Sequence, residues 1–150
     1  MKQRGKLAEF FKIFYICLVT TLVVWYFLNG LPLHDLPDEE DVVFVEIFDY
    51  TLSEEGTVSA ELTEPKDIAN ACNMANLLHY TLRPSYSDKE PQIEILYHLS
   101  DGKELHLFYG EDFVVWNNKQ LTLKKNDDSE LFPKAIRGLF FLPETQINDE

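Results

Sequence analysis

The residues that come closest to a chemical site lie on one predicted β-hairpin. Glu94, His98, Glu104 and His106 recur with a spacing that places all four on one face of that hairpin. Imidazole nitrogens and carboxylate oxygens bind Zn²⁺, which requires three or four such ligands. A solvated polar face is what a half-buried antiparallel sheet ordinarily presents. We therefore expect no bound metal or cofactor, and a metal-binding or metal-sensing domain that uses the His98/His106 face is the alternative.

The register of this hairpin decides which side chains share a face. A two-residue turn would mix polar and apolar side chains on both faces of the hairpin. A three-residue turn with Gly102 as the left-handed bulge residue instead sets Tyr97 opposite Leu105 and Ile95 opposite Leu107. Because a one-residue slip exchanges the two faces, the cleaner segregation favours the bulged turn.

No catalytic motif accompanies the hairpin. Ser100 and Lys103 match the S-x-x-K pattern of penicillin-binding enzymes, but that chemistry needs a helix start where Asp101-Gly102 predicts a turn. G-x-S-x-G, H-E-x-x-H, phosphate-loop and dinucleotide fingerprints are absent from the sequence. Pairs of carboxylates are weak evidence in a chain with 26 acidic residues. We expect no enzyme, and a hydrolase with an unrecognised site is a further alternative.

Strands and helices of an α+β domain must position these residues. β-branched and aromatic runs predict strands over 42–51 and 57–62, the hairpin over 92–109, and a second hairpin of 113–116 and 120–123. A helix is expected to begin with Thr63 as its cap and Pro65 in its first turn, and to end before Pro84. After a polar break at 126–128, a short C-terminal helix is expected over 129–141. The predicted fold is a small antiparallel sheet packed with one main helix and this short helix, all preceded by a transmembrane helix.

An apolar stretch near the N-terminus predicts that transmembrane helix. Ile13–Leu28 is sixteen residues without a charge, a length of roughly 24 Å against a hydrocarbon core of about 30 Å. Aromatic residues flank the stretch, including Phe10 and Phe11 before it and Trp25 near its end. Because Trp and Tyr favour the membrane interface, this pattern is typical of one membrane span.

Charge asymmetry predicts how the span is oriented. Segment 1–12 carries a net charge of +3, and the rest of the chain, in which acidic side chains far outnumber basic ones, carries −16. Lys and Arg stay on the cytoplasmic side, so the N-terminus is expected inside and the acidic domain outside the cell membrane. Such a domain repels phosphate backbones, which excludes nucleic acid as a partner. The sequence after the span, 29–33, has no Ala-x-Ala-like site, which favours a retained signal anchor over a cleaved signal peptide.

These features divide the chain into five segments. We expect a cytoplasmic tail (1–12), a transmembrane signal anchor (13–31), an acidic Pro-containing tether (32–41), an extracytoplasmic α+β domain (42–143) and an acidic C-terminal tail (144–150). Pro32, Pro37 and the acidic run 38–41 favour an extended, solvated tether. Cys17 lies in the span and Cys72 on a helix, so no disulfide is expected and Cys72 is interpreted as a buried structural residue.

Two surfaces are candidates for binding a partner. Arg83 and Tyr86 fall in or near the longest predicted loop, and Tyr and Arg are enriched at protein contacts. The exposed side of the main helix, with Asn70, Asn73 and Asn76, is the second candidate.

The overall pattern resembles small bacterial membrane-anchored proteins with one N-terminal span and an outward-facing α+β domain of unassigned function. The basic start, the span, Pro65–Ile68 at a helix start and the run Ile93–Lys103 carry this resemblance. It implies a location and an architecture, with the lipid bilayer and another membrane or envelope protein as partners. The expected function is a non-catalytic binding or regulatory domain that acts on another envelope component.

Overall fold

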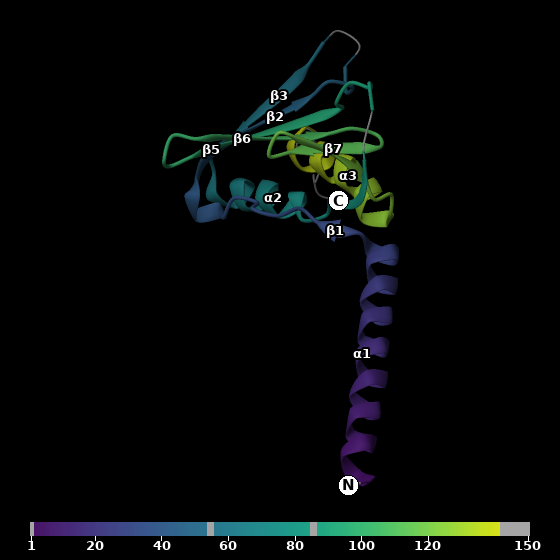
Figure 1. Cartoon of the computed structure of the whole chain (residues 1–150). Helices are drawn as coiled ribbons and strands as arrows, with labels where there is room; N and C mark the ends of the chain where they lie inside the picture. Colours follow the sequence, from purple (N-terminus) through teal and green to yellow (C-terminus); the bar gives the residue numbers. More distant parts are fainter. Residues whose placement is uncertain (1, 54–55, 85–86, 142–150) are drawn as a thin grey trace, which may run out of the picture. The chain divides into compact units, whose positions relative to one another are not determined.

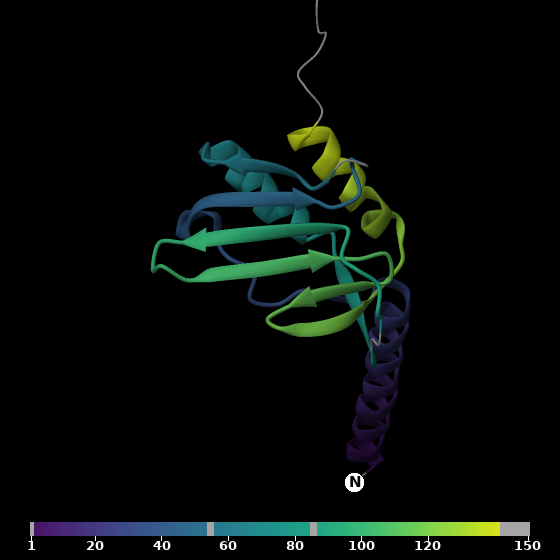
Figure 2. The same cartoon turned by 90° about the horizontal axis from the view of Figure 1, so that it is seen from above.

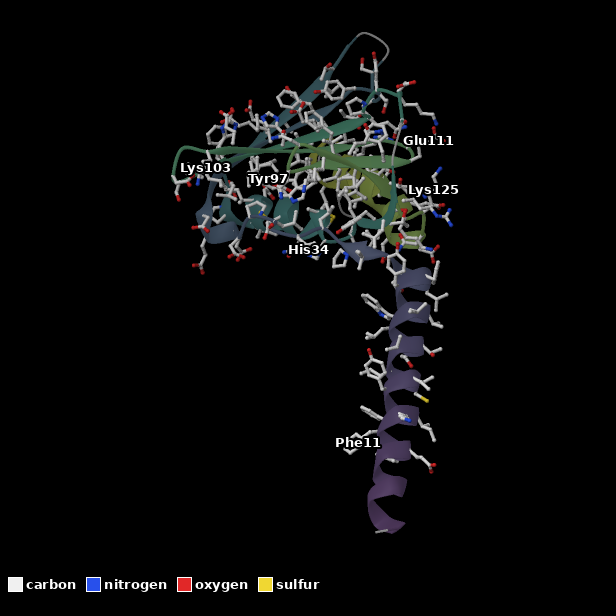
Figure 3. All side chains as sticks on the ribbon, in the orientation of Figure 1. Phe11, His34, Tyr97, Lys103, Glu111 and Lys125 are labelled. Atoms are coloured by element: carbon white, nitrogen blue, oxygen red, sulfur yellow. The ribbon has the colours of Figure 1, made fainter. Side chains whose placement is uncertain are left out.

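The computed structural model describes residues 2–53, 56–84 and 87–141, which fall into two compact units, Met1–Leu31 and Pro32–Glu150. The first unit is helix α1 (Lys2–Asn29), on which Figure 3 labels Phe11. Its segment Glu9–Asn29 is long and apolar enough to cross a membrane, and it is the one such helix among the described residues. By length and composition it fits either a membrane span or a signal sequence.

The fold is α+β, as predicted, with an eight-stranded antiparallel sheet (Figures 1 and 2). The strands are β1 (Leu31–Pro32), β2 (Val42–Asp49), β3 (Val58–Leu62), β4 (His79–Pro84), β5 (Ile93–Leu99), β6 (Glu104–Tyr109), β7 (Phe113–Trp116) and β8 (Lys119–Leu123). Their order across the sheet is β1-β4-β8-β7-β6-β5-β2-β3. Helices α2 (Pro65–Ala75) and α3 (Asp127–Phe140) lie on the same face of the sheet (Figure 1). We call this face inner and the opposite face outer.

The β5–β6 hairpin has the predicted bulged register. Tyr97 pairs with Leu105 and Ile95 pairs with Leu107. Gly102 adopts φ 83°, the left-handed conformation that the bulge requires, and the Leu99 N–H donates to the Lys103 carbonyl across the turn. The predicted register is therefore confirmed. It could be predicted from the sequence because strand alternation and a glycine at the turn are both local signals.

The second predicted hairpin is confirmed, with a shorter turn than its sequence suggested. Asn117 and Asn118 have φ 50° and 58°, and Lys119 already pairs with Trp116. Two consecutive positive φ angles define the two-residue turn that matches the twist of antiparallel strands, and asparagine tolerates this conformation.

The main helix differs from its prediction at both ends. Its N-cap is Glu64 rather than Thr63, and no side chain caps it, although Pro65 occupies the first turn as expected. It ends at Ala75, although the sequence predicted a longer helix that ends only shortly before Pro84. The missing stretch forms strand β4, which pairs with β8 in the sheet. Helical periodicity was misleading here because Leu78, a buried residue between α2 and β4, has the spacing of a residue on the buried side of the helix.

The core lies between the inner face of the sheet and the two helices. Tyr97 is fully buried there and donates a hydrogen bond from its hydroxyl to the Ala71 carbonyl of α2, 3.3 Å away (Figure 3). Phe132 and Ile136 of α3 are also fully buried. On α2, Ile68, Ala71, Cys72 and Ala75 are buried, which confirms the interpretation of Cys72 as a buried residue.

The segment expected to be a solvated tether is in part packed against the domain. Leu33 is only 6% exposed and belongs to the core, and Leu36 packs against the core. The Trp116 indole donates a hydrogen bond of 2.6 Å to the His34 carbonyl. The acidic run that follows forms a short 3₁₀ helix, Glu39–Asp41. The expectation of an extended, solvated chain was therefore wrong at Leu33 and Leu36. These two leucines flank His34, and burying their apolar side chains favours packing against the domain.

A buried ion pair joins β2 to α3. Asp49 is fully buried, and its carboxylate accepts hydrogen bonds from Arg137 Nε at 2.6 Å and from the Thr51 backbone N–H at 2.8 Å. Burial by itself raises the pKa of Asp49, but the hydrogen bonds from Arg137 and Thr51 outweigh it and hold the pKa below its usual value. The helix that presents Arg137 begins at a capping box between Asn126 and Ser129, where the sequence had predicted only a polar break.

Candidate functional site

The outer face of β2, β5 and β6 carries the ionisable residues that the sequence singled out. Alternation along the strands places their apolar neighbours on the inner face, and cross-strand pairing aligns the polar residues in rows. One row runs Phe44, His98, Glu104, and the next runs Glu46, Leu96, His106. The predicted sharing of one face by Glu94, His98, Glu104 and His106 therefore follows from the observed register.

His98 lies between two carboxylates and against an aromatic ring. Its Nε2 lies 2.8 Å from Glu46 Oε2, and its Nδ1 lies 3.4 Å from Glu104 Oε1. The Phe44 ring stacks on the imidazole with centroids 3.9 Å apart and planes 12° from parallel. Both ring nitrogens are thus engaged, and the stack fixes the orientation of the ring.

Glu94 connects a tyrosine to the second histidine. Its carboxylate accepts a hydrogen bond from the Tyr50 hydroxyl and lies 2.7 Å from His106 Nδ1. Burial, together with the neighbouring Glu94 carboxylate, raises the pKa of Tyr50 to about 12, so the phenol stays protonated and remains a donor. The His106 ring lies nearly parallel to the Phe108 ring, with centroids 5.8 Å apart.

The structure divides the four predicted residues between two separate clusters. His98 contacts Glu104 and Glu46, whereas His106 contacts Glu94. Across residues 2–53, 56–84 and 87–141, no group of three or more His, Cys, Asp or Glu side chains is arranged to hold a metal ion. Instead, the carboxylates of this face contact the two imidazoles separately, two at His98 and one at His106.

The strands that form this face and flank it carry glutamates but no permanently charged basic residues. Strands β2, β3, β5, β6 and β7 contain neither lysine nor arginine. Their glutamates are Glu46, Glu61, Glu94 and Glu104. Both polar and aromatic side chains of this face reach the solvent. The side chains of His106 and Glu104 are 44% and 56% exposed, and the rings of Phe44 and Phe108 are partly exposed. We call this surface, formed by the outer face of β2, β5 and β6, the acidic aromatic face.

A groove on the other side of the domain includes part of the second predicted surface. Asn73 and Asn76 of α2 line it together with Cys72 and the segment 36–40, around a volume of about 770 Å³. Burial, together with nearby Glu39, raises the pKa of the Cys72 thiol to about 11. The thiol therefore stays protonated near neutral pH, which agrees with a structural role and not with a nucleophile.

The predicted loop surface is only partly described. Arg83 lies in strand β4, where it is exposed and its carbonyl accepts a 2.9 Å hydrogen bond from the Thr122 hydroxyl. Tyr86 lies outside the described residues. A strand position for Arg83 was missed because the preceding helix was extended too far along the chain.

Sequence reasoning missed three contributors to the acidic aromatic face. Phe44 and Glu46 come from β2, and Tyr50 follows it, all far earlier in the chain than their partners His98 and Glu94. Alternation along a strand places Phe44 and Glu46 on one face, but no local signal shows that β2 lies beside β5.

Comparison with family models, with curated proteins and with solved structures found no match to this chain.

Proposed function

We propose that this chain is a single-pass, membrane-anchored protein whose extracytoplasmic domain binds or regulates another envelope protein without catalysis. The observation that carries the proposal is the acidic aromatic face. It combines exposed carboxylates with aromatic rings on strands that hold no lysine or arginine. Partly exposed aromatic side chains supply contact area at protein interfaces, and fixed charges select the partner.

The chemistry of this face supports binding over turnover. Each imidazole contacts at least one carboxylate and stacks beside a phenylalanine, so contacts within the face already orient both rings. The Tyr50 hydroxyl has a raised pKa and so does not act as a nucleophile near neutral pH. A preorganised surface of this kind loses little side-chain freedom when a partner binds.

The charge of the face defines the chemistry of the partner. A cationic surface of another envelope protein complements the glutamates, whereas an acidic one is repelled. Anchoring through α1 would hold the domain near other membrane proteins and raise its effective concentration toward them. This supports an envelope protein with a basic contact surface as the partner.

Site-specific photo-crosslinking in the cells that make the protein tests this proposal. A photoreactive residue in place of Phe44 should capture one specific envelope protein, and high salt should reduce the yield because the contact is electrostatic. The matched control is Leu131, an apolar residue on α3 that is 50% exposed. Equal capture from both positions, or none from Phe44, would contradict the proposal.

The anchor has its own test. The mature N-terminus should lie before Ile13, and a reporter fused after Glu150 should be active outside the cytosol. A mature chain that begins beyond Asn29 would identify α1 as a cleaved signal sequence instead.

A further inference from the structure

The two edges of the sheet differ in how well they resist pairing with another strand. At one edge, β1 is very short and one of its members is Pro32, which has no N–H to donate. At the other edge, β3 is a regular strand, Val58–Leu62, without proline or lysine. Unprotected edges of this kind accept an additional strand.

The hydrogen-bond pattern identifies the backbone groups that point to the free edge. The Leu99 N–H donates toward β6, so by alternation the even-numbered residues of β5 bond to β2. The odd-numbered residues of β2 then bond to Leu62, Ala60 and Val58 of β3. This leaves the N–H and C=O groups of Ser59 and Glu61 directed away from the sheet. In the part of the chain that the structure describes, no residue bonds to these groups.

Glu61 determines which kind of strand fits. It is exposed and lies directly opposite Glu46 across the β2–β3 pair. Like charges directly opposite each other on a sheet destabilise the pairing. Glu46 contacts His98, whereas Glu61 has no ion-pair partner among the described residues. A lysine or arginine on an added strand, beside Glu61, would provide that partner.

We propose that the free edge of β3 binds an extended, lysine- or arginine-bearing segment of a partner protein by strand addition. The inference rests on the proposed function, because it assigns the recognition mode of that same cationic partner. The acidic aromatic face is continuous with this edge through the Glu46–Glu61 pair. A second copy of the chain is disfavoured as the occupant, because two domains with a net charge of −16 each repel one another.

Binding of labelled model peptides to the full-length chain in detergent micelles tests the edge. The probe is a short capped peptide of alternating lysine and valine. One control replaces each lysine with glutamate, and the other replaces each valine with proline, which keeps the charge but cannot form a strand ladder. We expect the lysine–valine peptide to bind at least about tenfold more tightly than either control. Equal binding of the proline peptide would overturn strand addition.

Protein variants and amide exchange locate the contact. The lysine–valine peptide should slow exchange of the Ser59 and Glu61 amides, and Glu61→Lys should weaken its binding about tenfold. Glu130→Lys makes the same charge change on α3 and should alter binding by less than about twofold. An unchanged affinity in Glu61→Lys, or a dimer of the unliganded chain paired through β3, would overturn the inference.

Cross-linking separates this inference from the proposed function. If Phe44 captures an envelope protein and Glu61→Lys leaves the yield unchanged, the proposed function stands and the strand-addition route is wrong. If the peptide binds at β3 and no envelope protein is captured in cells, the proposed function is wrong.

Discussion

The two faces of β2, β5 and β6 are built from alternating residues of the same strands, yet one is buried and apolar and the other is partly exposed and polar. The inner face carries Val45, Ile47, Ile95, Tyr97 and Leu107, all fully buried against the helices. The outer face carries histidines, glutamates and phenylalanines that contact one another and are in part exposed. The inner face therefore determines the stability of the domain, whereas the outer face is available for recognition.

Ionic contacts on the two faces differ in the same way. Asp49 is buried and depends on Arg137 to satisfy its charge. The outer histidine–glutamate contacts remain partly hydrated, with 44% of the His106 side chain exposed. Removing one partner of a buried pair leaves an unsatisfied charge, whereas water replaces a lost partner at the surface.

The largest effect is expected from removing the partner of Asp49. Arg137→Met should lower the free energy of unfolding by about 3–5 kcal/mol, because the Asp49 carboxylate stays buried without its cation. Urea denaturation of the full-length chain in nonionic detergent measures the change. Arg83→Met, at an exposed strand position, is the control and should change stability by less than about 0.5 kcal/mol. Similar losses in both variants would show that the buried pair has no special importance.

Adjacent residues of β5 compare the two faces directly. Ile95→Ala should cost about 2–5 kcal/mol, because it removes buried methyl groups and leaves a cavity on the inner face. Leu96→Ala, at the next position along the strand and on the outer face, should cost about 1 kcal/mol, because this side chain is only half-buried. The same denaturation experiment applies, and a larger loss for Leu96 would reverse the assignment of the faces.

Acid should weaken the buried contact of β2 with α3. The pKa of Asp49 is lower in the folded chain than its usual value of 3.8, so the native state binds this proton less readily than the unfolded state does. The resulting stabilisation is complete above the unfolded pKa and is lost as the pH falls through the folded pKa. The unfolding free energy measured between pH 5 and pH 2 should therefore decline, and Asp49→Asn should remove part of that slope. An unaltered slope in Asp49→Asn would contradict the assignment.

The smallest effect is expected on the outer face. Phe44→Ala and His98→Ala should each cost about 1 kcal/mol, with a coupling of about 0.5–1.5 kcal/mol from the ring stack. A double-mutant cycle measures that coupling. Additive costs would show that the two rings are neighbours without an energetic interaction.

The success of the sequence predictions depended on how local each signal was. Gly102 and strict alternation fixed the β5–β6 register within one short continuous segment, and turn asparagines located the β7–β8 hairpin. Strand β4 was missed because its partner, β8, is distant in the sequence. Strands β5, β6 and β7 lie between them along the chain. The Asp49–Arg137 pair joins residues 88 positions apart, and nothing near either residue indicates the other. For the candidate site, one hairpin was predictable, whereas its continuation onto β2 required the sheet order.

The unequal accessibility of the two imidazoles provides a built-in reporter for this protein. The His98 side chain is 18% exposed, with both nitrogens engaged, whereas that of His106 is 44% exposed. A reagent that acylates imidazole should therefore label His106 first and leave His98 largely unmodified. Loss of His106 labelling in intact cells would then reveal when a bound molecule shields the surface, before that molecule has been identified.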